Sequence, residues 1–104
     1  EKKQLLKDAK LLQDLGVFSI VLECVKAQTA KLITKALKIP TIGIGSSQFC
    51  DGQVLVTDDL LGLNETNIRF VKKFTNLRKS INYGVKKFKE EVISGKYPTK
   101  RHSY

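Results

Sequence analysis

The chain has 104 residues, of which 41% are hydrophobic and 28% charged, with a net charge of +9 at pH 7. This is the size of one domain or part of one, and the composition is that of an ordinary soluble protein. No apolar run approaches the roughly 20 residues of a membrane-spanning helix. One histidine and two cysteines are too few for a structural zinc site, which needs about four such ligands. Because the sequence contains no methionine, we expect a piece of a longer protein.

The positive charge is spread along the sequence. Lysines lie on helix-like segments, without the interleaved aromatic residues on which bases of a single strand stack. We interpret them as a solvated surface and expect no nucleic acid and no membrane as partner. Cys24 and Cys50 lack a Cys-x-x-Cys spacing, which favours free thiols in a reducing, cytoplasmic compartment.

The first half of the chain predicts helix, strand, helix and strand in that order. Residues 4–15 carry apolar positions at i, i+4 and i+7, and Gly16 ends this helix. Residues 17–22 form an apolar run typical of a strand buried on both faces. A second helix over 27–37 stops before a proline, and 41–45 form a second short strand. This strand–helix–strand order predicts a parallel pair.

The second half predicts one more strand and a long helix. Residues 53–56 are a strand candidate, but the loop 46–52 before them is shorter than the dozen or so residues of a usual parallel crossover, so a hairpin stays open. Residues 68–93 predict a helix, followed by a loosely ordered basic tail over 94–104. The apolar stripe of this predicted helix consists of Phe70, Phe74, Leu77, Ile81, Val85, Phe88 and Val92.

Alternating helices and strands indicate the α/β class. Strands buried on both faces need neighbours at both edges, and three short strands cannot supply them. The pattern therefore predicts part of a larger parallel α/β protein, either a barrel or a doubly wound sheet.

Glu23 directly follows the first apolar strand run. In both parallel architectures the active site lies at the carboxyl ends of the strands. A carboxylate partly withdrawn from water at such a rim can move protons near neutral pH. Glu23 is therefore the first candidate for a catalytic residue, although many strands simply end at a polar side chain.

Two further groups of residues carry weaker signals. A Gly-x-Gly turn followed by two serines could approach a phosphate. However, it lacks the lysine of a Walker loop and the third glycine of a dinucleotide fingerprint. A tight turn is therefore the more common interpretation of this pattern. Three aspartates could bind a metal, although turn and helix-cap roles are more common. These two groups are Gly43, Gly45, Ser46 and Ser47, and Asp51, Asp58 and Asp59.

Five segments, in this order and spacing, resemble the ketopantoate hydroxymethyltransferase (3-methyl-2-oxobutanoate hydroxymethyltransferase) family, and the resemblance covers essentially the whole chain. The segments are Val21-Leu22-Glu23-Cys24-Val25, Pro40-Thr41-Ile42-Gly43-Ile44-Gly45, Cys50-Asp51-Gly52-Gln53-Val54-Leu55-Val56, Asp59-Leu60-Leu61-Gly62-Leu63, and Glu91-Val92-Ile93-Ser94-Gly95-Lys96-Tyr97-Pro98 with His102-Ser103. The chain departs from the family at Lys26, where proline is usual, at Ser47, where glycine is common, and at Thr57-Asp58, where an aromatic–histidine pair is more usual.

The resemblance implies the C-terminal portion of a single (β/α)8 TIM barrel of the phosphoenolpyruvate/pyruvate superfamily, about strands 6–8 with their helices. It favours a parallel third strand after a truncated connection. It also implies a homo-oligomer as large as a decamer, in which the C-terminal helix over 68–93 is exchanged between subunits.

The implied activity is that of a transferase. The family moves a hydroxymethyl group from 5,10-methylenetetrahydrofolate to 3-methyl-2-oxobutanoate, giving ketopantoate for pantothenate and coenzyme A synthesis. Glu23 matches the family's catalytic carboxylate, which handles the proton next to the ketone. The family's magnesium (Mg2+) ligands lie on earlier strands, so no metal ligand is expected in this chain, and the folate-contacting residues stay unassigned. The fragment alone is expected to be inactive.

Two alternatives stay open at this point. One is a small basic helical module that binds an acidic partner or nucleic acid through residues 68–101. The other is a remnant without activity. A buried strand that ends in glutamate has no purpose in the first alternative, and this observation favours the enzyme.

Overall fold

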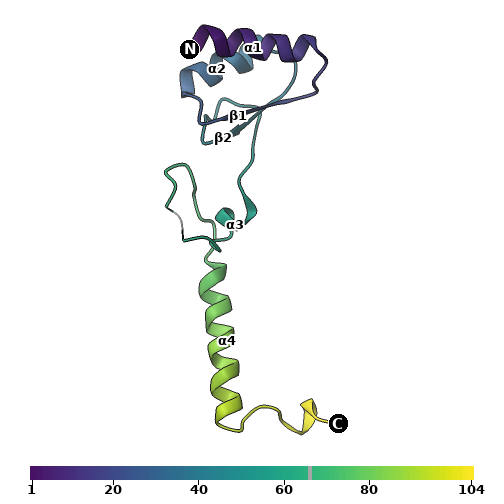
Figure 1. Cartoon of the computed structure of the whole chain (residues 1–104), viewed down its shortest axis with the longest axis vertical. Coiled ribbons are helices and arrows are strands. Elements are labelled where there is room, and N and C mark those ends of the chain that lie inside the picture. Colours follow the sequence, from purple (N-terminus) through teal and green to yellow (C-terminus); the bar gives the residue numbers. More distant parts are fainter. Residues whose placement is uncertain (66) are drawn as a thin grey trace. The chain divides into compact units, whose positions relative to one another are not determined.

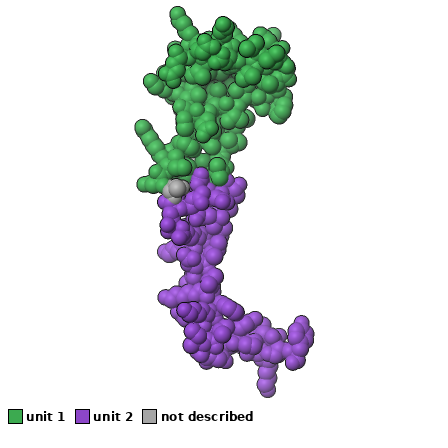
Figure 2. Space-filling model, viewed as in Figure 1, with its two compact units in different colours: residues 1–56, 67–71 green, residues 57–66, 72–104 purple. Residues whose placement is uncertain are grey.

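The computed structural model describes residues 1–65 and 67–104. It contains two compact units (Figure 2). Unit 1 comprises residues 1–56 and 67–71, and unit 2 comprises residues 57–66 and 72–104.

Unit 1 is a three-stranded parallel sheet with two helices. Its elements are α1 (Lys2–Asp14), β1 (Ile20–Glu23), α2 (Ala27–Ala36), β2 (Thr41–Ile44) and β3 (Gly52–Gln53). The strand order is β1-β2-β3, and both pairs are parallel. The predicted α/β class and the parallel direction of the third strand are therefore confirmed, and the hairpin alternative is wrong. The bounds predicted for this strand, 53–56, are wrong, because β3 spans only Gly52–Gln53.

The core of unit 1 lies between the sheet and its two helices, which cover the same face (Figure 1). Along β1, buried and exposed residues alternate, so Ile20 and Leu22 face the core while Val21 and Glu23 face the opposite side. Ile33 of α2 is the largest apolar side chain that is fully buried there. The residues buried in this core are Ala9, Ile20, Leu22, Ala30, Ile33 and Cys50.

The strand predicted over 17–22 begins only at Ile20. The first ladder hydrogen bond runs from the Ile20 N–H to the Pro40 carbonyl at 3.0 Å. Because β2 starts at Thr41, the residues before Ile20 have no strand beside them in the described chain. Phe18 is accordingly 88% exposed. The apolar run predicted the strand but could not reveal where its partner begins.

A partly buried polar network ties the start of β2 to the loop before β3. One carboxylate oxygen of Asp51 accepts hydrogen bonds from the Thr41 N–H at 2.8 Å and from the Thr41 hydroxyl at 3.2 Å. The Thr41 hydroxyl also lies 2.7 Å from that of Thr34 on α2. Thr41 is fully buried, so these bonds satisfy groups that water cannot reach.

Unit 2 contains α3 (Thr57–Leu60), α4 (Leu77–Ile93) and a 3-10 helix (Lys100–His102). The helix predicted over 68–93 begins at Leu77 instead. The side chain of Asn76 caps it by accepting a hydrogen bond from the Lys79 N–H at 3.1 Å. The Phe74 and Leu77 N–H groups donate to the Leu60 and Leu61 carbonyls, and these bonds hold the preceding residues out of the helical ladder.

The C-terminal residues are more regular than the loosely ordered tail that the sequence predicted. The 3-10 helix has a reciprocal cap, in which Thr99 and His102 exchange hydrogen bonds between side chain and backbone. The Tyr97 ring lies 5.6 Å from the Phe88 ring and 5.2 Å from that of His102, measured between centroids. In the described part of the chain, no helix has both the length and the apolar character needed to cross a membrane.

Candidate active site at the strand ends of unit 1

Glu23 is the last residue of β1 and pairs in register with Ile44, the last residue of β2. The carboxyl ends of these parallel strands therefore meet at one rim. Glu23 is exposed on the sheet face that α1 and α2 leave uncovered. Within the described residues its carboxylate takes part in no recorded salt bridge. The prediction that Glu23 ends a strand is confirmed.

The backbone directly after Glu23 is unusual. Cys24 has a φ of 53°, in the left-handed region that residues with a side chain rarely adopt. Its N–H still donates to the Ile44 carbonyl at 3.0 Å, so the strand ends in a sharp, hydrogen-bonded turn. Such a conformation costs on the order of 1 kcal/mol or more and persists only where the surroundings fix it.

The ends of β1 and β2 are also linked by a side chain. The Ser46 hydroxyl donates to the Val25 carbonyl at 3.0 Å. Together with the bond from Cys24 to Ile44, it fixes the rim on which Glu23 stands. Sequence reasoning found neither the turn nor the link, and no pattern in the sequence signals a bond between residues so far apart.

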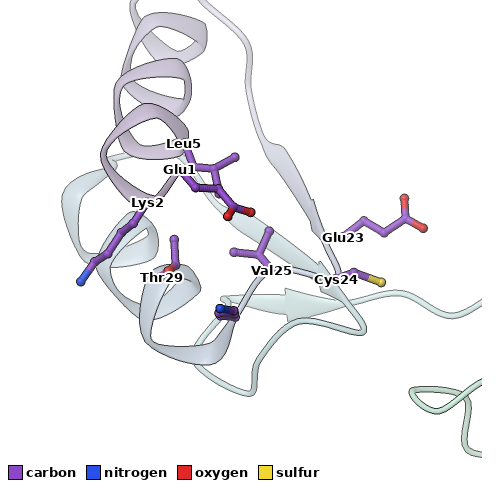
Figure 3. A pocket seen from close by; sticks show the side chains of 8 residues that line it. Glu1, Lys2, Leu5, Glu23, Cys24, Val25 and Thr29 are labelled. Carbon is purple, nitrogen blue, oxygen red and sulfur yellow. The ribbon is translucent and has the colours of Figure 1, made fainter.

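A hollow of about 440 Å³ lies beside Glu23. In Figure 3 the Glu23 and Cys24 side chains extend away from Leu5 and Val25, which lie toward the helices. Two carboxylates and two lysines line the hollow, so its formal charges balance. The lining residues are Glu1, Lys2, Leu5, Glu23, Cys24, Val25, Lys26 and Thr29.

The Gly-x-Gly turn serves packing in this structure. A Cβ atom on Gly43 would lie 2.8 Å from Oε1 of Gln53 and 3.1 Å from Sγ of Cys50, so a larger residue would require these side chains to shift. Ser47 accepts a hydrogen bond from the Phe49 N–H at 3.1 Å. With Ser46 bonded to Val25, both serine hydroxyls are engaged within the protein, which favours the tight-turn reading over a phosphate loop.

The three aspartates do not converge on one point. Asp51 is bonded to Thr41 as described, and Asp59 is buried and accepts a hydrogen bond from the Asn64 side chain at 2.9 Å. Asp58 and Asp59 stand in the first turn of α3, where acidic residues are common. Over residues 1–65 and 67–104, no three His, Cys, Asp or Glu side chains form a group that could hold a metal ion.

Comparison with known proteins gives a consistent answer. A family model described as ketopantoate hydroxymethyltransferase matches residues 1–100. A 3-methyl-2-oxobutanoate hydroxymethyltransferase of Pelagibacter ubique is 62% identical over 104 residues, which is all of this chain and 40% of that protein. Proteins of the same name from Pyrococcus furiosus and Kosmotoga olearia are 49% and 54% identical, over 98% and 92% of this chain. Each of these two matches covers 36% of the relative, so the chain spans about two fifths of the length of these relatives.

Proposed function

This chain belongs to the ketopantoate hydroxymethyltransferase family, and we propose that it is the C-terminal portion of an enzyme with that activity. The enzyme would transfer a hydroxymethyl group from 5,10-methylenetetrahydrofolate to 3-methyl-2-oxobutanoate and give ketopantoate for pantothenate biosynthesis. The relatives named above all carry an enzyme's name. The comparisons therefore do not support the alternative of a basic binding module.

The observation that carries this proposal is the position of Glu23. The reaction must remove a proton from C3 of the keto acid, a carbon next to a ketone, and such a carbon is a very weak acid in water. Glu23 stands at the carboxyl rim of parallel strands, on the face away from the helices, and this position supports the proposal that its carboxylate takes that proton. The chain's own contribution to the chemistry is thus the acid–base group.

The uncovered face of the sheet supports the barrel. Val21 is 59% exposed on it, although valine is most often buried. In a (β/α)8 barrel the helices cover only the outer face, and apolar side chains fill the inside. We propose that β1, β2 and β3 are about strands 6–8 of such a barrel, and that residues 1–104 are part of this single domain.

The free edges of the sheet agree with this arrangement. Within the described residues β1 pairs only with β2, and β3 only with β2. An unpaired apolar strand edge is a liability in a soluble protein. Neighbouring strands from the part of the relatives that this chain does not span would pair with both edges.

Magnesium is the metal that the family resemblance implies. The described residues do not form a site for it, since no suitable group of ligands is present among them and the carboxylates of Asp51 and Asp59 accept hydrogen bonds within the protein. We therefore propose that its ligands belong to the part of the relatives that the chain does not span.

The enzyme's compartment and assembly are also part of the proposal. Cys24 and Cys50 are both free thiols, which suits the cytoplasm. The apolar stripe of α4 is exposed, and a homo-oligomer, up to a decamer, would cover it by exchange of this helix between subunits.

The test uses a complete enzyme in which this chain replaces the matching residues of the Pelagibacter ubique relative. With Glu23→Gln, we expect the turnover number to fall by about 10²–10⁴-fold, because the amide keeps the shape but cannot accept the proton. The dissociation constant of the keto acid should change little.

Deuterium exchange at C3 of 3-methyl-2-oxobutanoate, followed without folate, isolates the proton-transfer step. Gln28→Glu, on the exposed first turn of α2, is the matched control and should exchange at the normal rate. Exchange in Glu23→Gln at the rate of the unsubstituted enzyme would assign the proton to another group.

A further inference from the structure

A second hollow, of about 630 Å³, adjoins the one beside Glu23. The two share Cys24, Val25 and Lys26, so they meet along the turn that follows β1. The rest of its lining comes from the start of α2, from the end of β2 and from a segment far along the chain. These residues are Ala27, Gly45, Ser46, Arg69 and Phe70.

The charges of this hollow are all positive. Among residues 1–65 and 67–104, the only charged residues that line it are Lys26 and Arg69, and no carboxylate does. Among the described residues neither cation takes part in a recorded salt bridge. Lys26 is also the N-cap of α2, where the helix presents the positive end of its dipole and no side chain caps it. The hollow therefore attracts an anion, and arginine suits a carboxylate in particular.

One wall of the hollow is aromatic and held in place by a glycine. Gly45 has a φ of +58°, and a Cβ atom there would lie 2.5 Å from Cγ of Phe70. The Phe70 ring thus rests directly on the backbone of Gly45, a contact that no other residue would allow. A flat apolar surface beside two cations suits a ligand that has both an aromatic ring and a carboxylate.

We propose that this hollow binds the p-aminobenzoylglutamate end of methylenetetrahydrofolate. The glutamate carboxylates meet Lys26 and Arg69, and the benzoyl ring lies against Phe70. The inference rests on the proposed function and adds a binding site for the co-substrate. The keto acid also has a carboxylate, but it has no aromatic ring to use the Phe70 wall.

The test measures KM in the same complete enzyme for two co-substrates, methylenetetrahydrofolate and methylenetetrahydropteroate, which lacks the glutamate. For Lys26→Gln and Arg69→Gln, we expect the KM for the folate to rise by about three- to fivefold each, and by roughly tenfold in the double variant. The KM for the pteroate should stay unchanged, because it has no carboxylate for these cations.

Three further measurements sharpen the result. Added salt should raise the folate KM of the unsubstituted enzyme and affect the double variant less. Phe70→Leu should raise KM for both co-substrates by about two- to tenfold, since both keep the benzoyl ring. Lys35→Gln, in the last turn of α2 and outside the hollow, is the control and should change neither KM.

The inference is overturned if the double variant leaves the folate KM unchanged, or if it raises the KM for folate and pteroate equally. Its failure can be told from that of the proposed function. Absence of keto acid deuterium exchange in the unsubstituted enzyme counts against the function itself, whereas normal exchange with an unchanged folate KM rejects only this binding site. A combined Lys26→Arg and Arg69→Lys variant, which keeps both charges, should retain most of the preference for folate.

Discussion

Unit 1 and α4 differ in how they treat their apolar side chains. Unit 1 buries a continuous core between its sheet and its helices, and Ile33 at its centre is 1% exposed. On α4 no residue is buried, and Val85, in the middle of the apolar stripe, is 64% exposed. An apolar stripe of this length seldom stays in water on a soluble protein. The comparison teaches that unit 1 obtains its core from local strand–helix–strand packing, whereas α4 leaves its apolar stripe uncovered within the described chain, which is the basis for proposing an interface there.

The largest expected effect breaks the proposed interface of α4. Val85→Glu places a charge in the stripe, and an unpaired charge buried in an interface costs about 3–5 kcal/mol. In the complete enzyme we expect dissociation of the oligomer into smaller species, measured by analytical ultracentrifugation. Circular dichroism should report a retained helix content in the subunits.

Lys87→Glu is the control for this experiment. It introduces the same side chain into the same exposed helix, outside the apolar stripe. If Lys87→Glu dissociates the oligomer as readily as Val85→Glu, net charge and not the stripe governs assembly. If neither variant changes the mass, α4 does not form a subunit interface.

A smaller effect is expected in the core of unit 1. Ile33→Ala should lower the free energy of unfolding by about 2–5 kcal/mol, because it removes buried methyl groups and leaves a cavity. Leu32→Ala, on the same helix but 36% exposed, should cost much less. Urea unfolding of the complete enzyme with unchanged m values measures both. Equal losses at the two positions would show that the described core does not govern stability.

Sequence reasoning succeeded where the signal is local. α2 was predicted from its periodicity and its stop before Pro40, and Glu23 was placed at a strand end because an apolar run stops there. It failed where a residue far away in the sequence determines where an element begins or which residues come together. β1 begins only where Pro40 and the first residue of β2, Thr41, provide partners for it. The hollow that includes Arg69 and Phe70 has no sequence signal at all, because its walls are far apart in the chain.

The start of α4 lies between these two cases, because a local signal was present but the predicted start was wrong. Phe70 and Phe74 continue the period of the stripe, so periodicity alone extends the helix to Ile68. Asn76 is a strong N-cap residue type, and this signal was present in the sequence. Its side chain accepts the Lys79 N–H at 3.1 Å, while the Phe74 N–H is bonded to the Leu60 carbonyl. The start of α4 at Leu77 is therefore determined by hydrogen bonds within unit 2.

The smallest expected effect tests this cap. Asn76→Ala removes the acceptor of the Lys79 N–H and should cost about 1 kcal/mol. Since α4 buries none of its residues, its first turn is held within the described chain by this cap and by the bond from the Leu77 N–H to the Leu61 carbonyl. Hydrogen exchange of the Lys79 amide should accelerate by roughly fivefold, while amides near Phe88 keep their rates. Asn82→Ala, an exposed asparagine inside the same helix, should not accelerate exchange, because alanine favours the helix more than asparagine does. If the Lys79 amide exchanges at the same rate in both variants, the start of α4 is set instead by the bonds from the Phe74 and Leu77 N–H groups to the Leu60 and Leu61 carbonyls. The Asn76 cap would then be a consequence of the fold of unit 2. The start of α4 would change only when those backbone bonds are broken.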